Sequence, residues 1–206
     1  MTDHTEILNR LDREAATSVR LAWRGERVNS HLLPVDVARE RFETEMAQIS
    51  ASPEAQGVRA EDFEVPLRAR TVDVRMYRSR DQLSPVIVYL HGGGWVTGSI
   101  ATHDVVCRSL ALATGCAIVS VNYRLAPENP YSAAVSDATE VTFWVCRHAS
   151  DLNIDASRLA VPGDSAEANL AMAVSLLAAG SKDLQISMQI LVYPITPTDL
   201  NLYFDN

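Results

Sequence analysis

The chain has 206 residues, of which 47% are hydrophobic and 21% are charged, a balance typical of a globular protein with one sizeable core. Its formal net charge of −8, without a basic cluster, argues against nucleic acid and anionic membrane surfaces as partners, so we expect a small molecule to bind. The longest apolar runs are too short to span a membrane, and the charged N-terminal stretch lacks the apolar core of a secretory signal. These features predict a cytoplasmic protein.

Roughly the first 50 residues are predicted to be helical, and a loop with Pro53 and Gly57 follows them. Four apolar residues of this part recur at spacings of four, four and three, which places them on one helix face: Ala38, Phe42, Met46 and Ile49. From Asp62 the period changes to two, and FEVPLR and TVDVRMY predict an antiparallel pair of strands. One side of this pair would carry three apolar residues: Val72, Val74 and Met76.

Strands and helices alternate in the rest of the chain. Apolar runs predict strands at VIVYL, AIVSVNY, RLAV and ISMQILVYP. Helices are expected between them, from Asp104 to a stop at Gly115, over about 133–148, and from Ser165 to a stop at Gly180. This alternation specifies an α/β fold, a mostly parallel sheet with helices on both faces. A ligand is expected at the carboxyl ends of the strands.

Two motifs lie at those strand ends. HGGGW, residues 91–95, follows VIVYL, and its three glycines let the backbone aim amide groups at a ligand oxygen. By itself such a loop is equally compatible with phosphate binding or with a simple turn. GDSA follows RLAV, and Ser165 there stands between a strand and a helix, a context that holds a serine on a tight turn. The amide of Ala166 would begin that helix and could receive a developing oxyanion.

In this order and spacing, HGGGW, NYRLAPENPY with Asp137 after it, GDSAEANLA and LVYP resemble the hormone-sensitive-lipase-like branch of the α/β-hydrolases, the acetyl esterase type. The resemblance covers roughly residues 60–195. It implies an α/β-hydrolase fold and a serine carboxylesterase that acts on short-chain acyl esters with no cofactor and no metal. It also implies an N-terminal helical cap at residues 1–55 and a partial hydrolase core at residues 56–206.

The resemblance implies a role for each motif residue. Ser165 would attack the ester carbonyl, and backbone amides would hold the oxyanion that forms. The residues that would supply these amides are Gly92, Gly93 and Ala166. The remaining motif residues would support the loop and the turn: His91, Gly94, Gly163 and Asp164.

The catalytic triad is incomplete in these 206 residues. In the α/β-hydrolases the acid and the base follow the nucleophile along the chain, but no histidine follows Ser165. The five histidines all precede it and are expected to have local structural roles: His4, His31, His91, His103 and His148. About a third of the expected catalytic domain is absent. Three accounts stay open: a truncated esterase, which we favour; an esterase completed by a partner chain; and an inert α/β-hydrolase-like binding protein.

Two residues near Ser165 depart from the pattern. Glu167 stands where the resemblance implies a glycine, and it is expected to crowd the turn and to extend its charge into water. Removing its side chain would then stabilise the fold. Pro162 removes a backbone donor near the end of a predicted central strand. Together these two residues suggest that the geometry of the nucleophile turn is less strictly maintained in this chain.

Two further expectations concern the C-terminal strand and the cysteines. ISMQILVYP would form an apolar edge strand with open amides and carbonyls, which predicts self-association of the chain through that edge. The alternative is that the residues after it fold back and cover it. The three cysteines are expected to be reduced core residues without a chemical role: Cys107, Cys116 and Cys146.

Overall fold

The computed structural model describes residues 12–13, 16 and 32–195 of the chain. By its internal contacts the chain forms two compact units, Met1–Ala38 and Arg39–Asn206. Helix α3 covers Val35–Met46 and includes Ala38, Phe42 and Met46 of the predicted face, whereas Ile49 lies beyond its end and is exposed. Most of the helical part predicted before residue 32, with His4 and His31, lies outside the described residues. The boundary between residues 55 and 56 stays a prediction.

A short helix, α4 (Pro53–Gln56), occupies the segment for which the sequence predicts a loop. The hydroxyl of Ser52 accepts a hydrogen bond from the Ala55 amide at 3.2 Å, which caps the helix. Proline at the first position has its φ already set for a helix and lacks an amide that would otherwise be unpaired there. The prediction of a loop was wrong because a capping serine followed by proline starts a helical turn.

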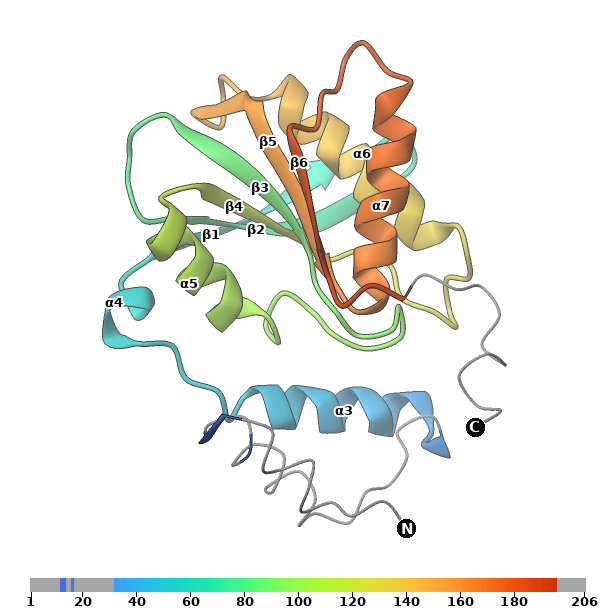
Figure 1. Ribbon diagram of the computed structural model, residues 1–206. Coiled ribbons are helices and arrows are strands. Elements are labelled where there is room, and N and C mark those ends of the chain that lie inside the picture. The colour runs from blue at the N-terminus through green and yellow to red at the C-terminus, as the bar shows by residue number, and fades with distance from the viewer. Residues whose placement is uncertain (1–11, 14–15, 17–31, 196–206) are drawn as a thin grey trace. The chain divides into compact units, whose positions relative to one another are not determined.

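In the described part of the chain, six strands form one sheet in the order β1-β2-β4-β3-β5-β6 (Figure 1). β1 and β2 are antiparallel, as are β2 and β4, whereas β4, β3, β5 and β6 are parallel to one another. The predicted antiparallel pair and the mostly parallel α/β sheet are confirmed. The strand bounds are β1 Arg59–Pro66, β2 Thr71–Arg78, β3 Ser84–Leu90, β4 Ala117–Val121, β5 Ile154–Asp164 and β6 Met188–Val192.

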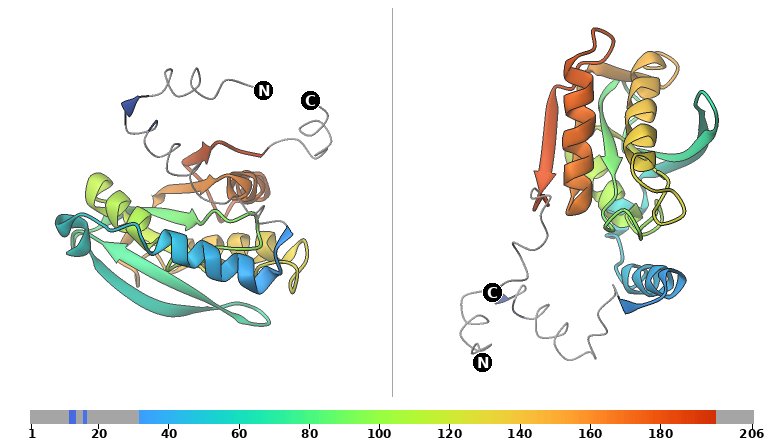
Figure 2. Two further views of the ribbon diagram at one scale, coloured as in Figure 1. Left: turned by 90° about the horizontal axis from the view of Figure 1, so that it is seen from below. Right: turned by 90° about the vertical axis from the view of Figure 1, so that its right-hand side faces the viewer.

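Three helices connect the parallel strands: α5 Asp104–Thr114, α6 Ala133–Arg147 and α7 Ala166–Ala179. α6 and α7 lie together on one face of the sheet, and α5 covers the other face (Figures 1 and 2). α5 ends at Gly115, whose φ of +69° provides the left-handed helix end that glycine adopts without strain. α7 ends before Gly180. Both helix ends agree with the sequence prediction.

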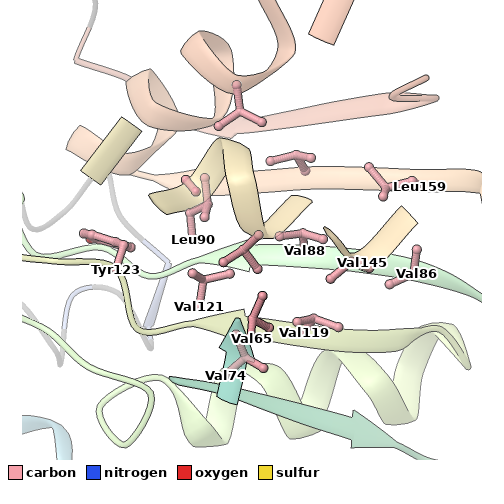
Figure 3. Close-up of a cluster of buried hydrophobic side chains, with 14 of the residues drawn as sticks. Val65, Val74, Val86, Val88, Leu90, Val119, Val121, Tyr123, Val145 and Leu159 are labelled. Carbon is pink, nitrogen blue, oxygen red and sulfur yellow. The ribbon is translucent and has the colours of Figure 1, made fainter. Parts of the chain in front are cut away.

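The side chains of the central strands alternate between two cores. On β3, Val86, Val88 and Leu90 belong to the larger cluster with residues of α6 and α7, and Ile87 and Tyr89 face α5. Figure 3 shows side chains of β3, β4 and β5 meeting in the larger cluster. Each fully buried aliphatic side chain contributes about 1.5–3 kcal/mol, so this alternation fixes the register of the strands. The three cysteines are free thiols; Cys107 is buried, and Cys116 and Cys146 are half-buried.

β6 lies at one edge of the sheet. β5 pairs with it on one side, and no strand among the described residues pairs with it on the other. Its exposed apolar side chains include Met188 and Ile190, with exposed fractions of 58% and 39%. Residues 196–206, which could cover this edge, lie outside the described residues. In the part of the chain that the structure describes, we find no helix with the length and apolar character needed to cross a membrane.

Candidate active site

Ser165 occupies a strained turn between β5 and α7. Its φ of +59° and ψ of −125° lie in a region that residues other than glycine rarely adopt. Gly163 makes the turn possible, because a Cβ atom there would lie 2.0 Å from the backbone oxygen of Glu167. The Ser165 amide donates to the carbonyl of Val192 on β6 at 2.9 Å, which ties the turn to the neighbouring strand. The expected tight turn therefore forms, and the Ser165 side chain borders a cavity.

The HGGGW loop closes on itself next to this turn. Gly93 and Gly94 have φ values of +148° and +67°, and a Cβ atom on Gly93 would lie 2.1 Å from the Thr97 backbone oxygen. The Thr97 amide donates to the Gly93 carbonyl at 2.9 Å. A side chain at Gly93 would collide with this backbone, which explains why the loop needs a glycine there. β3 and β5 are neighbours in the sheet, so the loop and Ser165 meet at the same strand ends.

Asp164 links the loop to the turn. Its Oδ1 accepts hydrogen bonds from the Tyr89 hydroxyl at 3.0 Å and from the Gly92 amide at 3.1 Å. A Cβ atom on Gly92 would lie 2.1 Å from Asp164 Oδ2, so the carboxylate packs directly against the glycine backbone. The Gly92 amide therefore already donates to Asp164, whereas the sequence analysis expected it to be free to bind an oxyanion.

Three other amides near Ser165 have no acceptor among the described residues: those of Gly93, Gly94 and Ala166. Gly93, Gly94 and Ser165 line one cavity of about 810 Å³. Ala166 is the first residue of α7, where the helix dipole places partial positive charge. The cavity wall also carries apolar side chains, including Phe42 and Val106. The arrangement offers backbone donors to a negative oxygen beside an apolar chamber.

His91 is a structural residue of the loop. Its ring is fully buried and stacks on the Tyr123 ring with centroids 4.4 Å apart. Burial lowers the pKa of His91 to about 3, so the ring stays neutral at physiological pH. Its Nδ1 lies 3.4 Å from the Tyr123 hydroxyl, and Nε2 has no hydrogen-bond partner among the described residues.

The other described histidines also make local contacts. His103 precedes α5 and lines the same cavity as Ser165, but its Nδ1 pairs with the Thr102 hydroxyl at 2.9 Å. His148 follows α6, and its Nδ1 lies 2.9 Å from the Trp144 carbonyl. Among residues 32–195, no histidine nitrogen makes a hydrogen bond to the Ser165 hydroxyl. The local hydrogen bond expected for His103 is confirmed.

Glu167 lies in the first turn of α7 and is fully buried, so the expectation that its charge reaches water was wrong. Its Oε1 lies 2.8 Å from the Trp95 amide nitrogen and 2.8 Å from the Tyr123 hydroxyl. Burial raises the pKa of this carboxyl. The signal for this burial was present in the sequence, because Glu167 shares one helix face with Leu170, Ala171 and Val174.

Comparison with known proteins gives relatives that share this fold. The family model described as alpha/beta hydrolase fold matches residues 87–204. Carboxylesterase NlhH of Mycobacterium tuberculosis is 41% identical over 173 residues, which cover 82% of this chain and 53% of that protein. Ethyl acetate hydrolase of Pseudomonas putida is 35% identical over 178 residues, which cover 84% of this chain and 56% of that protein.

A solved structure agrees with this result. The hyperthermophilic esterase from the archaeon Pyrobaculum calidifontis superimposes with a TM-score of 0.69 at 40% identity, covering 79% of this chain and 53% of that chain. This chain thus spans about half the length of the curated relatives that it matches. From its motifs, its sheet and these matches, the chain belongs to the α/β-hydrolase fold family.

Proposed function

We propose that this chain carries the nucleophile and the oxyanion donors of a serine carboxylesterase. Ser165 is the nucleophile, and the amides of Gly93, Gly94 and Ala166 hold the oxyanion. Gly94 replaces Gly92 in this set, because the Gly92 amide already donates to Asp164. The observation that carries the proposal is a serine on a strained turn that lines one cavity together with glycine amides for which the described residues offer no acceptor.

The chemistry follows from this geometry. The Ser165 oxygen attacks the ester carbonyl carbon, and the carbonyl oxygen gains negative charge. The serine proton passes to a general base, which later gives it to the leaving alcohol oxygen; no described histidine is in place for this role. Preorganised amides stabilise that charge more in the transition state than in the substrate, and one oxyanion donor contributes about 2.7–4 kcal/mol in a serine protease of a different fold. Collapse of the intermediate expels the alcohol and leaves an acyl group on the serine. No cofactor is needed for these steps.

The substrate class is a short-chain acyl ester. The cavity beside Ser165 is lined by apolar side chains: Phe42, Met46, Val106, Leu110 and Ile190. Such a wall accommodates an acyl chain, and the described residues that line it include no lysine or arginine to pair with a carboxylate or a phosphate. The names of the relatives, a carboxylesterase and an ethyl acetate hydrolase, support the same class.

The first prediction concerns turnover by the 206-residue chain itself. No histidine follows Ser165 in this sequence, and no described histidine bonds to its hydroxyl, so the serine keeps its proton at pH 7. We expect hydrolysis of 4-nitrophenyl butyrate to stay well below about 1 per second. Added imidazole, acting as a general base, should raise the rate for the wild-type chain more than for Ser165→Ala.

Two results would contradict this proposal. Turnover above about 1 per second that Ser165→Ala abolishes would mean that a base is already in place. Equal stimulation of wild type and Ser165→Ala by imidazole would favour the alternative of an inert binding protein.

A cytoplasmic location and a helical cap at residues 1–55 stay predictions. Cell fractionation can test the location, and limited proteolysis can test the cap.

We also propose that the chain self-associates through β6. The described part of the sheet leaves this edge unpaired, and its exposed side chains are apolar. An open apolar edge is a template for pairing with another strand, and a second copy of the chain offers the same edge.

A further inference from the structure

The side chain of Glu167 joins three elements around the candidate site. Its carboxyl projects from the start of α7 toward the HGGGW loop and toward Tyr123, which lies two residues after the end of β4. The Trp95 amide donates to Oε1 at 2.8 Å, and the Tyr123 hydroxyl lies 2.8 Å from the same oxygen. Trp95 is the last residue of the HGGGW loop and follows Gly94 directly. Glu167 therefore fixes the end of the segment that carries two of the proposed oxyanion donors.

A count of hydrogens defines the charge of this carboxyl. The Tyr123 hydroxyl oxygen lies 2.7 Å from the His91 carbonyl oxygen and 2.8 Å from Glu167 Oε1. Each short oxygen–oxygen contact needs one hydrogen between its atoms. The phenol supplies one, and the His91 carbonyl supplies none because it only accepts. The second hydrogen must come from Glu167, which is then a carboxylic acid.

The surroundings of Glu167 favour the same state. The side chain is fully buried, and among the described residues no lysine or arginine pairs with it. Two titratable groups face it besides the phenol. The Asp164 carboxylate opposes a second negative charge, and the neutral His91 ring offers no positive charge. Burial raises the pKa of Glu167 by more than the hydrogen bonds from Tyr123 and Trp95 lower it, and burial also raises the pKa of Tyr123.

We propose that Glu167 is an uncharged carboxylic acid that positions the HGGGW loop at the candidate site. Its role as a positioning residue rests on the proposed function, whereas its protonation and its hydrogen bond to Trp95 do not. A second carboxylate at this place, besides Asp164, would repel the developing oxyanion, because both charges would be negative. The neutral acid keeps the amide contact without that repulsion.

Infrared difference spectroscopy tests the charge directly. A protonated carboxyl has a carbonyl stretching band distinct from the bands of a carboxylate. At pH 7, the wild-type spectrum minus that of Glu167→Gln should show this carboxylic acid band. The matched control is Glu43→Gln, which removes an exposed glutamate on α3 and should show only carboxylate bands. Carboxylate bands alone in the Glu167→Gln difference at pH 7 would overturn the proposal.

Hydrogen exchange at the Trp95 amide tests the positioning. Glu167→Gln keeps an oxygen acceptor and should retain the protection of this amide. Glu167→Met keeps the length and helix propensity of the side chain but offers no oxygen, so protection should fall by about tenfold or more. Equal protection of the Trp95 amide in both variants would show that Glu167 does not position the loop through this amide. Both experiments are made on a Ser165→Ala background, so that they report on Glu167 even if Ser165 has no catalytic function.

Discussion

At the scale of single residues, the buried carboxylic acid gives the stability of the chain an unusual dependence on pH. Burial raises the pKa of Glu167 above that of the unfolded chain, where a glutamate titrates near about 4.3. The folded state then binds more protons than the unfolded state between these two pKa values. Stability from this group is therefore complete below pH about 4.3 and is lost as pH rises through the folded pKa.

Substitution with glutamine removes this titration. Relative to Glu167→Gln, the wild-type free energy of unfolding should fall by about 1.4 kcal/mol for each pH unit between the two pKa values. Urea denaturation of both proteins over a pH series from 4 to 8 measures the difference. Glu43→Gln, at an exposed position, should run parallel to wild type. If the wild-type chain instead became more stable relative to Glu167→Gln as the pH rises, Glu167 would be charged in the folded state and the prediction would be wrong.

The structure also reverses the expected effect of a smaller side chain at position 167. The close approach in the turn is between the backbone of Glu167 and Gly163, so the Glu167 side chain is not what crowds it. Removing that side chain would leave the Trp95 amide without its acceptor, at a cost of about 1–3 kcal/mol. We now expect Glu167→Gly to destabilise the chain.

Gly163 is the residue that the turn needs most. Gly163→Ala would place a methyl group 2.0 Å from the Glu167 backbone oxygen, and backbone cannot move away as a flexible side chain could. We expect a loss of about 3 kcal/mol or more in the free energy of unfolding, measured in urea. Gly180→Ala is the matched control, since nothing lies within 4 Å of the added atom and the φ of −86° suits alanine. Equal effects of the two changes would mean that the turn is not close-packed.

At the scale of elements, the sequence predicted the strands and helices of the hydrolase core well. Long apolar runs and helical periods identify β3, β4, α5 and α7, because burial on both faces of a sheet demands such patterns. α4 was missed because its four residues are too short for any periodicity, and only its cap reveals it. β6, the last strand of the described part, is the edge through which we expect the chain to associate.

Association through β6 can be blocked by a charge on that strand. Met188→Lys places a cation on its exposed surface, outside the cavity beside Ser165, and charged edges resist strand pairing. Light scattering over a concentration series should show oligomers of the wild-type chain that dissociate in this variant. Leu83→Lys, at an equally exposed position between β2 and β3, should leave association unchanged. A wild-type chain that stays monomeric at all concentrations would refute association and indicate a cover over the edge.

At the scale of the whole molecule, strand order decides which distant motifs can act together. β3 and β5 are neighbours although β4 lies between them in the sequence, and this order brings the HGGGW loop to Ser165. The motifs and their spacing were sufficient to predict that meeting. The partners of individual groups were not predictable, because the hydrogen bonds from Gly92 to Asp164 and from Trp95 to Glu167 join residues 72 positions apart. Those contacts exist only once the sheet has formed.

Covalent labelling of Ser165 tests the central claim most directly. In a reaction with a fluorophosphonate, the serine oxygen attacks phosphorus, the phosphorus–fluorine bond breaks, and fluoride and the serine proton leave. Oxyanion donors stabilise the negative charge that develops on the phosphoryl oxygen, so the folded chain should be labelled faster than the unfolded chain although no described histidine bonds to Ser165. We predict one label per folded chain at pH 8, located on Ser165 by peptide mass analysis, faster than in urea and absent from Ser165→Ala. A folded chain whose Ser165 reacts no faster than the unfolded one, or a label that persists in Ser165→Ala, would contradict the account.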